Sequence, residues 1–155
     1  MAMKSVTVAL SDGSSNTMDD PKQSGGSLPV SPFHDPSRWT GENEHAFAIR
    51  DAYPLAEGHT LVVPKRAMGR TTQLTEEELL ACFRLIEEVK TALIKESGAD
   101  GFNVGVNENA AAGQTIAQLH FHVIPRFHGD IDDPVGGIRN IFPGRGNYLK
   151  STKEG

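Results

Sequence analysis

Hydrophobic residues recur along this chain either at every second position or at helical spacing. Each change from one spacing to the other indicates a new predicted element. Residues 45–51 place Phe47 and Ile49 on the side opposite two alanines, and residues 59–64 form a second apolar run that ends at a proline. Alternation with a period of two predicts strands. Because the connection between the two runs contains glycine and other turn-forming residues, the pattern predicts an antiparallel pair.

Residues 74–98 follow the helical period instead. Thr75 is suited to cap the N-terminus, with Glu78 completing a capping box, and Gly98 is suited to end the helix. Apolar side chains at helical spacing form one stripe, which we expect to pack on a sheet: Leu79, Cys82, Phe83, Ile86, Val89 and Leu93. Cys82 is therefore predicted to be a core side chain rather than a nucleophile.

Two more strands are predicted after the helix, at 102–108 and 117–125, with a loop of small residues between them. Strands on both sides of one long helix, without regular β-α-β alternation, are typical of an α+β domain. We therefore expect an antiparallel sheet with one long helix packed on it, followed by an irregular tail.

The first 30 residues form a separate compositional zone. Small polar and turn-forming residues dominate it, which predicts a flexible leader at 1–30 ahead of a domain at 31–155. Alternation within residues 4–10 predicts one short edge strand in this leader.

Composition narrows the class of protein. With 155 residues, of which 37% are hydrophobic, the chain can bury the core of one domain. The net charge of −5 gives no general basic surface for nucleic acid, and no apolar run approaches the roughly 20 residues of a membrane helix. The one cysteine allows no intramolecular disulfide, which favours a reducing, cytoplasmic location. We expect neither nucleic acid nor membrane as a partner.

The strand at 117–125 carries the candidate chemistry. Side chains two residues apart lie on one face of a strand, roughly 6.5–7 Å apart along the chain. Gln118, His120 and His122 therefore share a face, while the apolar residues between them point to the core. Three polar side chains in a row on so apolar a strand indicate a functional face.

The loop before this strand favours an oxyanion. Gly113 and its small neighbours let backbone amides approach a ligand closely, and Gln114 and Thr115 add neutral hydrogen-bond donors. These features suit a phosphate. An imidazole can attack phosphorus and form a covalent nucleotidyl-histidine, and a second imidazole, when protonated, can donate to a phosphate oxygen near neutral pH.

Spacing alone leaves three interpretations of the two histidines open. They can be exposed side chains without a role, they can chelate a metal, or they can carry phosphate chemistry. Two histidines at i and i+2 chelate readily, but a third ligand is required, and Gln118 is a poor one.

Residues 113–126, GQTIAQLHFHVIPR, resemble the signature of the histidine triad (HIT) family, in which Gly-Gln-Ser/Thr precedes His-x-His-x-His. Residues 45–66 resemble the N-terminal hairpin of that family and residues 101–114 its next strand and loop, so the resemblance spans 31–127. It implies an α+β fold whose sheet extends across a homodimer, with a nucleotide-binding cleft on each subunit. Members are mostly nucleotide hydrolases or transferases acting at the α-phosphate.

The resemblance also implies roles for single residues. The middle histidine of the triad, the nucleophile, falls on His120, and the last, which contacts phosphate and leaving group, falls on His122. Gln114 takes the catalytic phosphate-loop position. The remaining phosphate-binding positions fall on Asn107, Gly113 and Thr115. The ribose position falls on Asp51, and the base pocket on Phe33 and Ile49.

Gln118 stands where the family has its first triad histidine, and its amide is expected to hydrogen-bond within the substrate-binding site. Many similar members bind a structural zinc through Cys-x-x-Cys, a histidine after the Val-Pro-Lys strand, and that first histidine. The corresponding positions here are Ser31, His34, Ala67 and Gln118. Three of the four ligate poorly or not at all, so we expect neither zinc nor another cofactor, although a divalent metal can accompany a nucleotide.

The expected function is hydrolysis at the α-phosphate of dinucleoside polyphosphates or nucleoside phosphoramidates through a nucleotidyl-histidine. His122 favours hydrolysis, because the transferases and phosphorylases of the wider superfamily carry glutamine there. In-line attack requires that the other nitrogen of His120 donate to a backbone carbonyl, and His59 is expected to make only a structural hydrogen bond. The alternatives are a nucleotide-sensing homodimer with little catalysis and a metal-dependent hydrolase.

Overall fold

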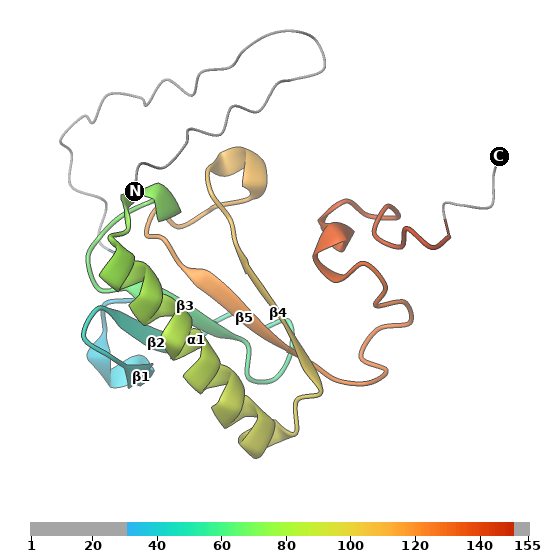
Figure 1. The fold of residues 1–155 in the computed structure, drawn as a ribbon, viewed down its shortest axis with the longest axis horizontal. Coiled ribbons are helices and arrows are strands. Elements are labelled where there is room, and N and C mark those ends of the chain that lie inside the picture. The colour runs from blue at the N-terminus through green and yellow to red at the C-terminus, as the bar shows by residue number, and fades with distance from the viewer. Residues whose placement is uncertain (1–30, 151–155) are drawn as a thin grey trace, which may run out of the picture.

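A computed structural model describes residues 31–150. The leader predicted at 1–30, with its short strand, lies outside the described residues. Five strands form one antiparallel sheet in the order β1-β2-β3-β5-β4, and one long helix crosses it (Figure 1). The α+β prediction is confirmed. The elements are β1 (Trp39–Glu42), β2 (Ala46–Arg50), β3 (Thr60–Pro64), α1 (Glu76–Ser97), β4 (Gly101–Val106) and β5 (Phe121–Arg126), with short 3-10 helices η1 (Pro36–Arg38), η2 (Thr71–Gln73), η3 (Ala110–Ala112) and η4 (Gly137–Ile141).

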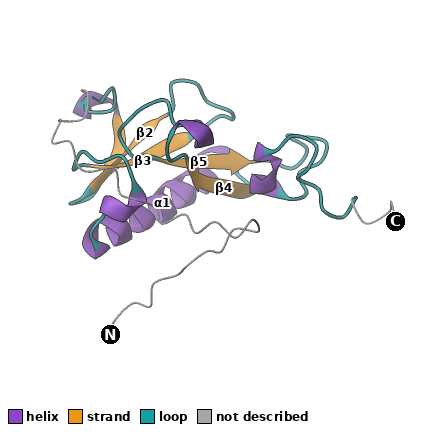
Figure 2. Cartoon of the chain, turned by 90° about the horizontal axis from the view of Figure 1, so that it is seen from above, coloured by secondary structure: helices purple, strands orange, loops and turns teal. Residues whose placement is uncertain are grey.

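Both faces of the central strands are buried. Helix α1 lies on one side of the sheet (Figure 2), where Ala46 and Ala48 leave room for it and pack with the apolar residues of β5. The opposite side holds a second cluster built on Phe47 and Ile49 of β2. Strand alternation thus divides β2 between two cores, as its sequence predicts.

The ends of α1 follow the sequence prediction. Thr75 accepts from the backbone N–H of Glu78 (3.2 Å), and the Glu78 carboxylate accepts from that of Thr75 (2.9 Å). Gly98 ends the helix at φ 69°. The predicted stripe is wrong at Leu79 and Phe83, which are exposed. The buried stripe includes Glu78, Ala81, Cys82 and Leu85 instead, so those two side chains lie at its margin.

One strand was not predicted, and the bounds of two predicted strands shift: β4 spans Gly101–Val106 rather than 102–108. Strand β1 had no clear sequence signal, since it has four residues and an irregularity between Trp39 and Gly41. Strand β5 begins at Phe121 rather than at 117, because its pairing with β3 reaches only from Thr60↔Val123 to Val62↔Phe121. Among the described residues, no helix is both long and apolar enough to cross a membrane.

Candidate active site

The candidate site lies on the face of β5 that points away from α1. Phe121 and Val123 pack in the core beneath the helix, so His122, between them, points to the other side, as predicted. The rings of His120 and His122 are 5.1 Å apart, and the edge of Phe33 meets His120 at 5.2 Å between centroids.

The hydrogen bonds of His120 assign its tautomer. Its Nδ1 lies 2.8 Å from the carbonyl oxygen of Gln118. A carbonyl only accepts, so Nδ1 carries the proton and Nε2 of the neutral ring holds a free lone pair. The residue is 8% exposed. Among the described residues, no hydrogen-bond partner faces its Nε2. This is the donor arrangement that in-line attack requires.

A second chain of hydrogen bonds assigns the tautomer of His122. The backbone N–H of Leu55 donates to Nδ1 of His59 (3.2 Å), so the proton of the neutral His59 ring sits on Nε2. That Nε2 lies 3.0 Å from Nδ1 of His122, which therefore accepts and leaves the His122 proton on its own Nε2. The two neighbouring rings thus present one unprotonated nitrogen, Nε2 of His120, and one N–H donor, Nε2 of His122.

Burial keeps this donor neutral. Burial is the largest of the effects that lower the pKa of His122 to about 4, and the neighbouring rings of His120 and His59 lower it further. The Asp51 carboxylate raises this pKa. Burial also lowers the pKa of His59. At neutral pH His122 therefore donates as an imidazole, and the expectation of a protonated donor is wrong.

Asp51 stands behind the histidine pair. Its Oδ1 accepts from the backbone N–H of Tyr53 (2.9 Å), and its Oδ2 lies 3.5 Å from Nε2 of His59 and 3.9 Å from Nδ1 of His122. Sequence reasoning treated His59 as merely structural, whereas its Nε2 donates to Nδ1 of His122 beside the Asp51 carboxylate. A histidine that opens a strand paired with the triad strand is the signal that could have found this connection.

The same three side chains are close enough for a metal. One ligand atom each from Asp51, His59 and His122 lie within 4.8 Å of one another. A metal-bound histidine, however, normally donates from its second ring nitrogen to an acceptor. Nδ1 of His59 instead faces the Leu55 N–H donor, so Nε2 must carry the proton. The arrangement fits a hydrogen-bond relay better than a metal centre.

The predicted phosphate loop follows β4. Gly113 is exposed at φ 85°, Thr115 is exposed, and Asn107 is half-buried. Gln114 is already engaged, since its Oε1 accepts from the backbone N–H of Asn109 (2.8 Å) and its Nε2 donates over 3.3–3.4 Å to two loop carbonyls. The long donor bonds are the weak ones, and they would have to break before this amide could donate to a phosphate.

Three predicted substrate-binding residues are buried in the protein. Ile49 belongs to the cluster opposite α1 and is enclosed by its neighbours, so it does not form an open pocket wall. Gln118 is 2% exposed, and its Nε2 donates to the carbonyls of Pro64 (3.0 Å) and Arg66 (3.3 Å). Its assignment as a substrate ligand is wrong, because the amide is used inside the protein. Phe33 is buried too, but it contacts His120.

The positions that resemble zinc ligands are also used otherwise. The Ser31 hydroxyl accepts from the backbone N–H of Phe33 (3.3 Å), and the His34 ring packs edge-on against Phe47. Ala67 is exposed and carries no donor atom. With the Gln118 amide directed at two carbonyls, these residues do not make a tetrahedral N/S set.

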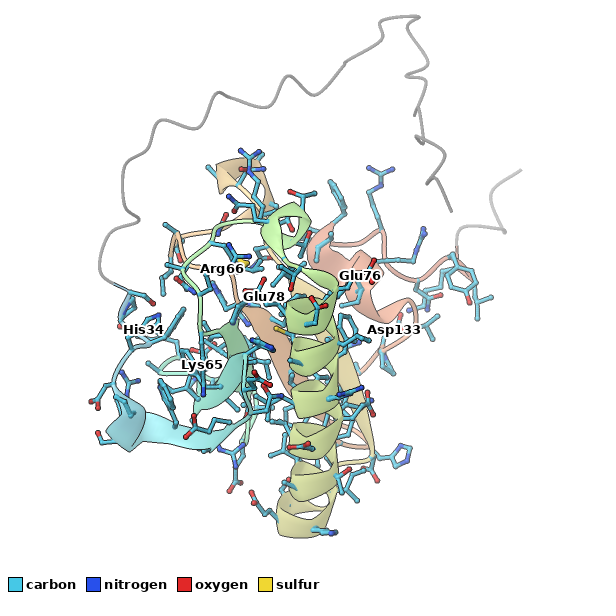
Figure 3. All side chains as sticks on the ribbon, turned by 60° about the vertical axis from the view of Figure 1, so that its left-hand side comes forward. His34, Lys65, Arg66, Glu76, Glu78 and Asp133 are labelled. Carbon is cyan, nitrogen blue, oxygen red and sulfur yellow. The ribbon has the colours of Figure 1, made fainter. Side chains whose placement is uncertain are left out.

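Arg66 and Glu78 lie close together at the start of α1 (Figure 3). The guanidinium makes two bonds to the carboxylate, of 2.7 and 2.6 Å. Hydrogen bonds from Arg66 are the largest cause that lowers the pKa of Glu78 to about 2. This pair holds the backbone whose carbonyl Gln118 contacts.

Comparison with known proteins shows which family this chain is similar to. The HIT domain family model matches residues 33–129. A HIT-like protein of Mycoplasma pneumoniae is 44% identical over 87 residues, which are 56% of this chain and 60% of that protein. The bis(5'-nucleosyl)-tetraphosphatase (asymmetrical) of Schizosaccharomyces pombe is 36% identical over 80 residues, 52% of this chain and 44% of the enzyme. The chain thus spans about half the length of these two relatives.

A solved structure agrees. The Caenorhabditis elegans NitFhit protein superposes with a TM-score of 0.62 at 31% identity, over 70% of this chain and 26% of that one. The matched residues include the β2–β3 hairpin, the loop after β4, His120 just before β5 and His122 within it. From the family match and this fold, the chain belongs to the HIT family.

Proposed function

We propose that this protein hydrolyses nucleotides at the α-phosphate, with dinucleoside polyphosphates or nucleoside phosphoramidates as substrates. One observation carries the proposal: the Gln118 carbonyl holds Nδ1–H of His120, which leaves the lone pair of Nε2 in the neutral ring for attack. The HIT family contains hydrolases of nucleotide phosphoanhydride bonds, and the relative named bis(5'-nucleosyl)-tetraphosphatase supports this class.

The reaction has two displacements. The lone pair of His120 Nε2 attacks the α-phosphorus, and the bond to the leaving group breaks with its electron pair moving to that group. The N–H of His122 donates to a phosphoryl oxygen as charge develops there. Water then attacks the same phosphorus, the N–P bond breaks, and its electrons return to His120. The proton that water loses balances the one that the leaving group takes up from solvent.

Further contacts belong to the same proposal. Asn107, Gly113, Gln114 and Thr115 are assigned to the phosphates, and Asp51 to the ribose hydroxyls. Phe33 is kept for the base side, because it contacts His120. The Gly113 N–H donates to the Ala110 carbonyl (3.0 Å), so this bond would have to be exchanged for one to the phosphate.

We propose that Gln118 takes the first triad position, two residues before His120, and that the chain works without structural zinc. The reason is the donor chemistry of the four positions described above. A chelator that left turnover unchanged would agree with this and would remove the metal-dependent alternative. Stoichiometric zinc in the purified protein would contradict it.

We also propose that the protein forms a homodimer. Strand β4 ends the sheet, and no strand of the described residues pairs with its outer side. Beside it, η4 packs on β4 and exposes Ile138 and Ile141. A second copy is the partner that would cover such an edge. Sedimentation showing a monomer at all concentrations would contradict this. A cytoplasmic location is part of the same proposal.

The test of function is a panel of dinucleoside polyphosphates and adenosine phosphoramidates. We expect turnover by the wild type, and none by His120→Gly, although this variant still binds nucleotide. His128→Gly is the control, since this histidine is exposed at the surface. Tight binding without product by the wild type would instead favour the nucleotide sensor.

A further inference from the structure

The carbonyl that holds the His120 ring lies outside the β-sheet. Pairing between β3 and β5 ends at Val62↔Phe121, so no ladder hydrogen bond fixes Gln118, three residues earlier. The tautomer of His120 depends on this carbonyl, so bonds other than ladder bonds must fix its peptide.

The side chain of Gln118 supplies the missing bonds. Both acceptors of its Nε2, the carbonyls of Pro64 and Arg66, belong to the end of β3 and the turn after it. A backbone bond acts beside them within the same peptide unit as the Gln118 carbonyl, from the Leu119 N–H to the Met68 carbonyl (2.6 Å). The amide thus continues the connection between β3 and β5 beyond the last ladder pair.

The orientation of the amide follows from its partners. Two carbonyls can receive only the NH₂ group, so Oε1 is left buried and without a partner. This amide orientation therefore serves the two donor bonds, at the residue whose own carbonyl contacts His120.

The acceptors are themselves fixed. Pro64 is paired with Ala46 in the sheet, the Lys65 N–H donates to the His45 carbonyl (2.8 Å), and the Arg66 guanidinium makes two bonds to Glu78 in the first turn of α1 and a third to the Gln73 carbonyl. A continuous path of hydrogen bonds therefore runs from the helix start through Arg66 and Gln118 to the His120 ring.

We infer that Gln118 is a positioning residue, whose side-chain amide clamps the peptide that holds His120 in its Nδ1–H form. This clamp occupies the position that, by family resemblance, would provide a zinc ligand. Its effect on turnover rests on the proposed function, but its effect on the His120 tautomer does not.

The clamp has a measurable consequence. Without it, the Gln118 carbonyl can move away from Nδ1, and the proton of the neutral ring is free to occupy Nε2, where attack is blocked. Small misplacements of reacting groups can lower rates about a hundredfold. Gln118→Met keeps the shape and removes both donors, so we expect kcat to fall at least about tenfold with KM nearly unchanged.

The experiment combines ¹⁵N NMR of the histidine rings with steady-state kinetics. We expect His120 to be Nδ1–H in the wild type and a mixture of tautomers in Gln118→Met. Gln118→His, which retains one N–H donor, should partly restore both kcat and the tautomer. The control is Gln73→Met: this glutamine braces the neighbouring turn, at Gly69 N–H and Arg70 N–H, without contacting His120.

A Gln118→Met protein that keeps the wild-type tautomer and kcat would overturn the inference, as would equal losses in Gln73→Met. If Gln118→Met does not fold, the comparison of Gln118→His with wild type decides, because a changed tautomer despite the retained donor contradicts the clamp. A wild type that turns over no nucleotide refutes the proposed function alone, since the NMR result still tests the clamp.

Discussion

The histidine pair and the phosphate loop meet at one site but are held in different ways. His120 and His122 are oriented by fixed partners, a carbonyl on one side and His59 on the other. The loop after β4 is held at its start by Glu108, whose carboxylate accepts from the N–H and the hydroxyl of Thr71, and further on by Gln114, with two of its three bonds longer than 3.2 Å. Its Asn109 adopts φ 67° and ψ 166°, a conformation that glycine favours.

This difference suggests a division of labour. Groups that must hold a particular proton before the substrate arrives are locked by strong, buried contacts. The groups that meet the phosphate are held weakly, so their bonds can be exchanged for bonds to the ligand. Changes behind the histidines should therefore alter the rate, and changes in the loop should alter stability and binding.

The largest expected effect comes from His59→Phe, which keeps a ring but removes the donor to His122. The His122 proton is then free to occupy Nδ1, and the donor at Nε2 is lost. We expect kcat to fall about a hundredfold, within the range measured when a general acid–base group is disabled. Steady-state kinetics beside His128→Phe as a surface control, with melting curves for both, would check this. A kcat within twofold of wild type in a folded variant would show that the relay has no role.

The next effect concerns pH. Because burial lowers the folded-state pKa of His122 to about 4, the unfolded chain, with a pKa near 6.5, binds more protons between these values. The contribution of His122 to the free energy of unfolding is therefore largest above about pH 6.5 and is lost as the pH falls towards 4. In the wild type, the free energy of unfolding should therefore fall as the pH is lowered through this window. In His122→Asn, we expect this fall to be smaller by about 2–3 kcal/mol. Urea titrations of both proteins measure it, and parallel pH curves would contradict the assignment.

The smallest effect concerns the loop. Asn109→Gly removes the strain of a positive φ, so the free energy of unfolding should rise by about 0.5–1 kcal/mol. Asn109→Ala should lower it by a similar amount. Chemical denaturation of the three proteins would rank them. If alanine proved as stable as glycine, the loop would not hold the backbone in this conformation.

Much of the fold followed from the sequence. Period-two and period-3.6 patterns predicted β2, β3, β4, β5 and α1, with both helix caps, because each signal is local. The α1 stripe was misplaced at Leu79 and Phe83, since the register of a helix on a sheet depends on the strands beneath it. Strand β1 is too short and irregular for its pattern to be distinctive.

The candidate site was less accessible to sequence reasoning. Same-face spacing brought His120 and His122 together correctly, and the requirement for a carbonyl on Nδ1 was met. The position of His59 behind His122 depends on the β3–β5 register, which no local pattern encodes. The burial of Gln118 and Ile49 likewise depends on tertiary packing.

The most direct measurement is mass spectrometry of the acid-sensitive adduct formed when the protein is mixed with a dinucleoside polyphosphate and rapidly quenched under alkaline conditions. The account predicts one nucleotidyl group on the peptide that contains His120, formed and lost at rates compatible with turnover. Product formation with the adduct on another residue, or full activity of His120→Gly, would contradict it.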